Sequence, residues 1–150
     1  MFKNIYSLNN NIRKKLCLNG EWKFKILDNN KWFDVKVPGS YTGVRSGWGH
    51  KYWDIWDYPL DWEGKGGIYK KVFTLPKEMK GKNVTFYCGG VRHHSKVMVN
   101  GKHVGEFNEG YVPFEFDITD FVKSGENEIK VRIVKEKEIY TTKRHINRSI

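Results

Sequence analysis

The chain has 150 residues, about the length of one domain, and 39% of them are hydrophobic and 15% aromatic. This composition excludes an intrinsically disordered chain, which would be poor in aromatic residues. The formal net charge of +10 could attract nucleic acid or another anionic surface. The lysines, however, mostly alternate with apolar residues, as on the solvated face of a β-sandwich, so we expect no nucleic-acid partner.

Membrane and secretion signals are also missing from the printed sequence. No apolar run approaches the roughly 20 residues that span a bilayer, so we expect no membrane association. The start, Met1–Tyr6, lacks the apolar stretch and small-residue cleavage site of a secretory signal, which predicts a cytoplasmic protein. Cys17 and Cys88 are too few for a disulfide framework. We expect two reduced, packed thiols, with a bridge or a reactive thiol as the alternative.

Hydrophobic residues at every second position predict a series of short, half-buried strands. In chain order these residues are Trp22, Phe24 and Ile26; Phe33, Val35 and Val37; Tyr69, Phe73 and Leu75, around Lys71; Val84, Phe86 and Cys88; Val97 and Val99; Phe114 and Phe116; and Ile129, Val131 and Ile133. Turn residues separate the runs, and Asn100-Gly101 is the strongest hairpin signal among them. No segment shows a helical stripe, so the pattern predicts an all-β sandwich or barrel.

Short motifs follow one another in a characteristic order. They are LNGEWKF at 18–24, VKVPGS at 35–40, GIYKKVF at 67–73, GKNV at 81–84, GGV at 89–91, VMVNGKHVG at 97–105, GYVPFEFDIT at 110–119 and GEN at 125–127. This series resembles the N-terminal domain of family 2 glycoside hydrolases, which include β-galactosidases, β-glucuronidases and β-mannosidases. The resemblance implies a jelly-roll β-sandwich of the galactose-binding-domain type. It divides the chain into an N-terminal extension (1–15), the sandwich (16–134) and a linker or tail (135–150).

The same motifs have a mechanical interpretation. Gly110 would permit a bend that places Tyr111 and Phe114 against the core. Asp117 and Thr119 would accept backbone N–H bonds in a local turn. On this interpretation the residues shape the fold, which we favour over direct contact with a ligand.

Catalytic residues are not expected in this chain. Glycoside hydrolysis normally uses two carboxyl groups that flank the scissile bond. The resemblance places both, as Glu residues, on a (β/α)₈ barrel of about 250 residues, for which the chain has no room. The resemblance also implies that the catalytic acid/base Glu follows an Asn. Asn108-Glu109 and Asn127-Glu128 have this order, but the first lies in a predicted turn and the second starts the last predicted strand, so both are interpreted as structural. We therefore expect part of a glycosidase that does not cleave glycosides by itself.

A long segment rich in Gly and Trp, residues 40–67, is the best candidate for contact with sugar. Its aromatic rings suit the C–H faces of sugars, and its carboxylates accept hydrogen bonds from hydroxyls. The candidate residues are Trp48, Trp53, Asp54, Trp56, Asp57, Tyr58 and Trp62. We favour packing of these aromatics against other domains over sugar contact, and both over a local core. Galactosidase relatives carry an Asn shortly before Tyr-Pro; Asp54 or Asp57 stands near Tyr58-Pro59 instead, which leaves that specificity open.

Metal ions and cofactors are not expected, because the adjacent His93 and His94 of a strand would point to opposite faces and no ligand cluster completes a site. Our preferred hypothesis is a non-catalytic domain that braces a catalytic barrel and shapes its substrate entrance. Its partners would be that barrel and a second sandwich domain of the same polypeptide or complex. A stand-alone carbohydrate-binding module is the alternative, and a truncated product without activity is also compatible with the sequence.

Overall fold

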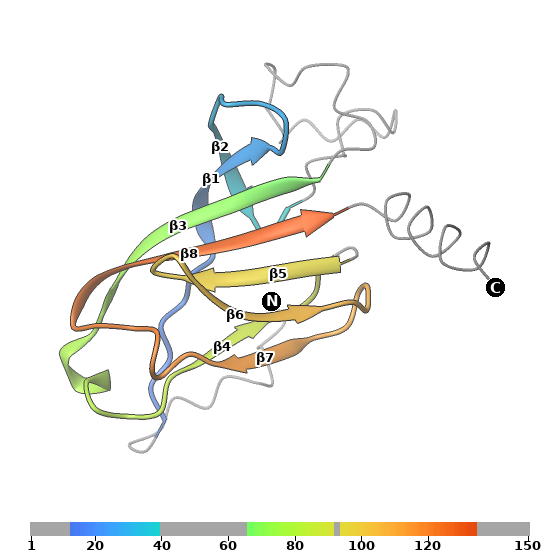
Figure 1. The fold of residues 1–150 in the computed structure, drawn as a ribbon. Helices are drawn as coiled ribbons and strands as arrows, with labels where there is room; N and C mark the ends of the chain where they lie inside the picture. Colours follow the sequence, from blue (N-terminus) through green and yellow to red (C-terminus); the bar gives the residue numbers. More distant parts are fainter. Residues whose placement is uncertain (1–12, 40–65, 92–93, 135–150) are drawn as a thin grey trace, which may run out of the picture.

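The computed structural model describes residues 13–39, 66–91 and 94–134, and these residues form almost exclusively β-strands (Figure 1). The strands and one short 3₁₀ helix are, in chain order, β1 (Gly20–Ile26), β2 (Phe33–Val37), β3 (Gly67–Leu75), η2 (Lys77–Met79), β4 (Thr85–Cys88), β5 (His94–Val99), β6 (Lys102–Phe107), β7 (Phe114–Asp117) and β8 (Gly125–Val134). Each strand coincides with one of the alternating runs or with the return arm of the Asn100-Gly101 hairpin. The predicted all-β class is confirmed.

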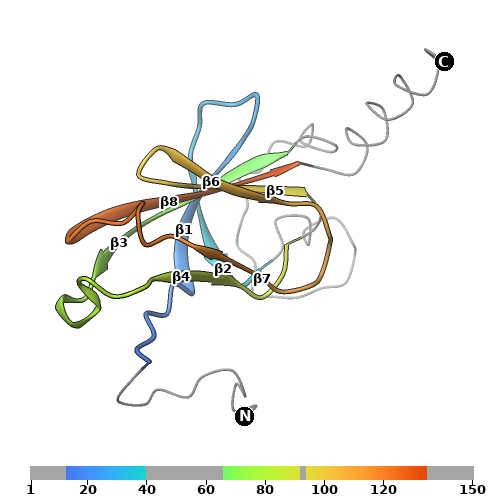
Figure 2. The same ribbon diagram turned by 60° about the horizontal axis from the view of Figure 1, so that its bottom comes forward.

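The strands form two antiparallel layers. Six of them pair in the order β2-β1-β3-β8-β5-β6, and β4 pairs with β7 in a separate two-stranded sheet. The longest pairing joins β3 to β8, from Gly67 opposite Ile133 to Leu75 opposite Gly125. Figure 2 shows β4 and β7 as a second layer facing one side of the six-stranded sheet. The six-stranded sheet is thus built around the β3–β8 pair, and the predicted sandwich is confirmed.

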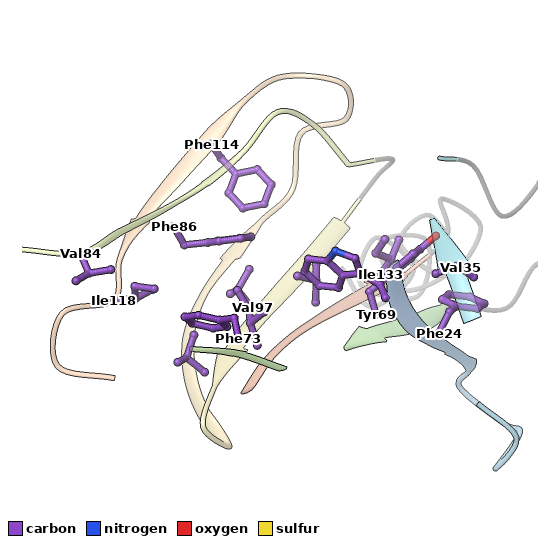
Figure 3. Close-up of a cluster of buried hydrophobic side chains, with 14 of the residues drawn as sticks. Phe24, Val35, Tyr69, Phe73, Val84, Phe86, Val97, Phe114, Ile118 and Ile133 are labelled. Atoms are coloured by element: carbon purple, nitrogen blue, oxygen red, sulfur yellow. The ribbon is translucent and has the colours of Figure 1, made fainter. Parts of the chain in front are cut away.

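The core lies between the two layers, where the inward residues of each strand meet (Figure 3). Phe24, Val97, Val99 and Ile129 are completely buried. From the smaller sheet Phe114 enters this core, with its ring centroid 4.6 Å from that of Phe107 in a stacked arrangement. Burying one such side chain stabilises the fold by roughly 1.5–3 kcal/mol. The period-two pattern of the sequence therefore identified the residues that hold the layers together.

Two glycines allow aromatic rings to approach the backbone closely. Phe24 packs on Gly67 at the start of β3, and a Cβ at that position would collide with its ring. Phe116 packs in the same way on Gly105 of β6, where an added Cβ would lie 2.5 Å from a ring carbon. The Val104-Gly105 motif of the sequence is thus explained by packing between the two sheets.

Both cysteines are free thiols, but the expectation that both are packed holds only for Cys88 and is wrong for Cys17. Cys17 is exposed, whereas Cys88 is half-buried against the core cluster. Burial raises the pKa of the Cys88 thiol, which disfavours its reactive thiolate form. Cys88 therefore acts as a small packing residue at the end of β4.

No helix among the described residues is long and apolar enough to cross a membrane.

The Gly105–Phe116 contact yields a stability prediction. We expect Gly105→Ala to lower the free energy of unfolding by about 1–3 kcal/mol, because the new Cβ overpacks the ring. Chemical denaturation measures the change. Gly89→Ala is the matched control, since the nearest atom to its added Cβ is a ring carbon of Tyr87 at 4.0 Å. Adding Phe116→Leu to Gly105→Ala should recover part of the loss, and a strictly additive double variant would contradict the packing explanation.

Candidate functional site

The residues predicted to contact sugar or another domain fall outside the described part of the chain. They are Trp48, Trp53, Asp54, Trp56, Asp57, Tyr58 and Trp62, all within residues 40–65. The structure describes the strands from which this segment departs and to which it returns. Their assignment as contact residues therefore stays a prediction.

The two attachment points of segment 40–65 are defined by strand register. Val37, at the end of β2, pairs with Gly20 at the start of β1. Gly67, at the start of β3, pairs with Ile26 at the other end of β1. Six residues of extended strand separate these positions, which is about 20 Å. The segment with the candidate residues is therefore anchored at both ends of the same strand.

The β3 anchor is held firmly in place. The Gly66 carbonyl accepts a hydrogen bond from the Leu27 N–H at 3.0 Å. A Cβ at Gly66 would collide with the backbone carbonyl of Ile133, so only glycine fits between β1 and β8. These contacts fix the point where segment 40–65 enters the sheet.

An exposed apolar patch lies on the two-stranded side of the sandwich. It consists of Tyr87 on β4 and of Tyr111 and Val112 in the loop between β6 and β7, which are 43%, 69% and 41% exposed. The Tyr111 N–H donates to the Val91 carbonyl at 3.2 Å, so this loop is tied to the chain after β4. The patch has the composition of a protein or sugar contact surface.

Tyr111 corrects one expectation. The bend was predicted at Gly110, with Tyr111 and Phe114 both packed against the core. The structure places the positive φ, 66°, at Tyr111 itself. Its ring therefore leaves on the solvent side, and only Phe114, 6% exposed, enters the core.

Two asparagines form a fully satisfied amide network at the opposite end of the sandwich. The Asn100 amide donates to Asn127 Oδ1 and to the Phe121 carbonyl, both at 2.8 Å. Asn127, 1% exposed, donates to the carbonyls of Lys123 and Gly125 and accepts the Lys123 N–H. All four amide hydrogens are used, so burial leaves no donor unpaired. The network ties the β5–β6 turn to the start of β8.

The two Asn-Glu dipeptides have different surroundings, and neither resembles a catalytic centre. Asn127 belongs to the buried network, and Glu128 pairs with Lys130 at 2.7 Å on the outer face of the sheet. This confirms the structural interpretation of Asn127-Glu128. Asn108 and Glu109 are exposed in the loop before β7.

A second polar cluster joins the two strands of the smaller sheet. The Thr119 hydroxyl accepts the Val84 N–H at 2.9 Å and donates to Asp117 Oδ1 at 2.6 Å. The Thr119 N–H also donates to that carboxylate, as expected for the predicted local turn. The hydrogen bond from the Thr119 hydroxyl lowers the pKa of Asp117. The ionised Asp117 carboxylate therefore stabilises the fold at a pH above the pKa that it has in the unfolded chain. This stabilisation is lost as the pH falls through the lower pKa that Asp117 has in the folded state.

Within residues 13–39, 66–91 and 94–134, no group of three or more His, Cys, Asp or Glu side chains is arranged so that it could hold a metal ion. His94 instead lies 3.3 Å from Glu106, which also pairs with Lys96 at 3.0 Å. The hydrogen bond from Lys96 lowers the pKa of Glu106. His93, the other member of the pair considered in the sequence, lies outside the described residues.

The sequence interpretation missed one feature of the outer face. Trp32 lies beside two lysines, with Lys70 Nζ 4.3 Å and Lys25 Nζ 5.5 Å from its ring centroid. Of these two lysines, Lys25 was interpreted as part of an ordinary solvated face. Trp32 stands two residues before Asp34, and residues two apart in an extended strand point to the same face. This spacing was the signal that could have placed the Trp32 ring on the outer face.

Comparison with known proteins identifies the domain. Residues 22–148 match the family model described as glycosyl hydrolase 2 galactose-binding domain-like. The chain belongs to this family. Within it, the alternating strands, the Asn100-Gly101 hairpin and the glycine contacts become features of a galactose-binding-like sandwich.

Curated relatives of this family member include whole glycosidases. The chain is 38% identical over 119 residues to a β-galactosidase of Thermoanaerobacter pseudethanolicus, covering 77% of this chain and 14% of that protein. It is 33% identical over 121 residues to a β-glucuronidase of Bacteroides fragilis, covering 80% of this chain and 16% of that protein. The chain therefore spans about one-seventh of the length of such relatives, which are larger enzymes.

Solved structures give the same result for the fold. A β-D-mannosidase from Dictyoglomus thermophilum superposes with a TM-score of 0.70 at 28% identity, over 85% of this chain and 16% of that one. A β-D-glucuronidase from the same organism superposes with a TM-score of 0.65 at 28% identity, over 78% of this chain and 19% of that one. The resemblance inferred from the ordered motifs is thus confirmed.

The amide network gives a second stability prediction. We expect Asn127→Asp to lower the free energy of unfolding by about 2–4 kcal/mol at pH 7, because a carboxylate would face the Lys123 and Gly125 carbonyls that now accept hydrogen bonds. Asn108→Asp adds the same charge at an exposed loop position and should change stability by less than about 0.5 kcal/mol.

Denaturant unfolding as a function of pH separates the causes. The penalty of Asn127→Asp relative to the unsubstituted chain should shrink as the pH falls toward about 4, because burial raises the pKa of the introduced carboxyl above its unfolded value and the protonated group can donate one hydrogen bond again. A penalty that stays constant with pH would contradict this explanation.

Proposed function

We propose that this chain is a non-catalytic N-terminal domain that braces the catalytic barrel of a family 2 glycoside hydrolase and helps shape its substrate entrance. The observation that carries the proposal is the match over residues 22–148 to a domain that makes up only about one-seventh of the relatives' length. The partners would be the barrel and a second sandwich domain. The named relatives act on β-galactosides and β-glucuronides, so we propose a β-glycoside of this kind as substrate of the whole enzyme.

The geometry of the described strands favours a non-catalytic role for this domain. Three carboxylates of the described strands form ion pairs with lysines of the sandwich itself, in the pairs Lys23–Asp34, Lys96–Glu106 and Lys130–Glu128. The exposed patch of Tyr87, Tyr111 and Val112 offers apolar area for another domain. Segment 40–65, with its tryptophans and aspartates, joins the sheet at Gly66, and on this proposal it extends to the substrate pocket of the barrel.

The first test compares the chain alone with the complete enzyme encoded by the same gene. We expect the 150-residue chain to leave aryl β-galactosides, β-glucuronides and β-mannosides intact, and the complete enzyme to cleave at least one of them. Release of the chromogenic phenol measures both. Hydrolysis by the isolated chain would overturn the non-catalytic role.

The second test addresses the aromatic segment in the complete enzyme. If it shapes the substrate entrance, Trp53→Ala and Trp56→Ala should raise KM by about tenfold, a loss of roughly 1.4 kcal/mol of binding energy. Val72→Ala, which shortens an exposed apolar side chain of β3, is the control and should leave KM unchanged. If the isolated chain instead binds neutral glycans and loses this binding on the same substitutions, the stand-alone module replaces the proposal.

A further inference from the structure

Cationic side chains form two rows across the outer face of the six-stranded sheet, the face turned away from β4 and β7. Strand register places Lys23 of β1 opposite Lys70 of β3, and Lys70 opposite Lys130 of β8. The adjacent row runs through Lys25, Ile68, Arg132, Lys96 and Glu106, on β1, β3, β8, β5 and β6. Neighbouring strands are about 4.8 Å apart, so these charges lie close together.

Carboxylates pair with three of the cations in these two rows. The three ion pairs are Lys23 with Asp34 at 2.6 Å, Lys96 with Glu106 at 3.0 Å and Lys130 with Glu128 at 2.7 Å. The remaining three cations, Lys25, Lys70 and Arg132, flank Ile68 at the centre. No carboxylate of the described residues forms an ion pair with any of them. Within the described ranges, the positive charge at the centre of the face therefore has no carboxylate paired with it.

This arrangement costs stability in the isolated sandwich. Like charges on directly opposed strand positions destabilise a sheet, and a Thr or Val at Lys70 would avoid that cost while fitting the strand at least as well. Three half-buried cations held around one position are better explained by an anion that completes the array than by solubility alone.

Trp32 adds an aromatic surface to the same place. Lys70 and Lys25 lie over its ring, using the ring's electron density as a partial substitute for a counter-ion. An aromatic ring suits the C–H face of a sugar, whereas the lysines and the fork-shaped Arg132 guanidinium suit a carboxylate. The combination fits a sugar unit that carries an acid group.

We propose that these four residues, Trp32, Lys25, Lys70 and Arg132, form a binding surface for a polysaccharide with uronate units. The proposal rests on the proposed function, because a domain of a glycosidase meets glycan chains. The three cations lie around Ile68 on the neighbouring strands β1, β3 and β8, so a polymer with one carboxylate on each sugar engages them together. None of the four residues belongs to segment 40–65, and the surface would hold the polymer without cleaving it.

Binding of polygalacturonate to the 150-residue chain tests the proposal. We expect saturable binding by calorimetry that weakens with added salt. The triple variant Lys25→Gln, Lys70→Gln, Arg132→Gln should weaken it by about tenfold or more. The control triple variant Lys77→Gln, Lys80→Gln, Lys82→Gln removes the same charge at exposed positions in and after η2, and should change the affinity less than about twofold. The melting temperature of each variant verifies its fold, and the first triple variant should be at least as stable as the unsubstituted chain.

Trp32→Ala separates sugar recognition from charge. It should weaken binding of polygalacturonate several-fold and leave binding of inorganic polyphosphate, which has no sugar ring, unchanged. Equal losses in the two triple variants, tighter binding of single-stranded DNA than of polygalacturonate, or no binding at all would each overturn the proposal. Because this readout involves no hydrolysis, a flat titration leaves the domain's role in the glycosidase standing, and failure of that role leaves the titration interpretable.

Discussion

The paired amides of Asn100 and Asn127 are the contact on which the rest of the sandwich depends. They join a hairpin turn to the first residues of β8, 27 positions away in the sequence, with every amide hydrogen used. Because β8 occupies the centre of the large sheet between β3 and β5, fixing its start also fixes the register of both neighbours. One end of the domain is thereby locked by buried polar bonds, which are directional, whereas the apolar core alone would tolerate small slips.

The opposite end is organised by close packing of backbone and rings. Phe24 lies on Gly67, and Gly66 fits between β1 and β8, so the point where segment 40–65 returns to the sheet is rigid. Function in such domains is expected from loops presented by a rigid scaffold. The division of labour is consistent with the family: a stable sandwich supplies fixed anchor points, and the chemistry of the whole enzyme is proposed to lie elsewhere.

Local patterns in the sequence were sufficient for the strands, the hairpin and the Asp117–Thr119 turn, because each depends on residues close in the chain. The order of the short motifs along the chain was sufficient to predict the family. The Asn100–Asn127 contact could not be predicted, since it requires knowing that the β5–β6 turn meets the start of β8. Tyr111 was placed wrongly because a pattern does not show which residue of a bend takes positive φ. The array around Ile68 depends on the register of strands far apart in the chain, which appears only in the folded sheet.

The register of the central pair has a consequence for how the domain could be joined to others. Ile133, next to the last residue of β8, lies directly opposite Gly67, where the tryptophan-rich segment rejoins the fold. A linker that follows β8 therefore starts about one strand spacing from Gly67, where β3 begins. A short flexible linker keeps the domain attached to it at a millimolar effective concentration. Contacts too weak to form between separate molecules would therefore suffice to seat a covalently attached neighbour against this corner.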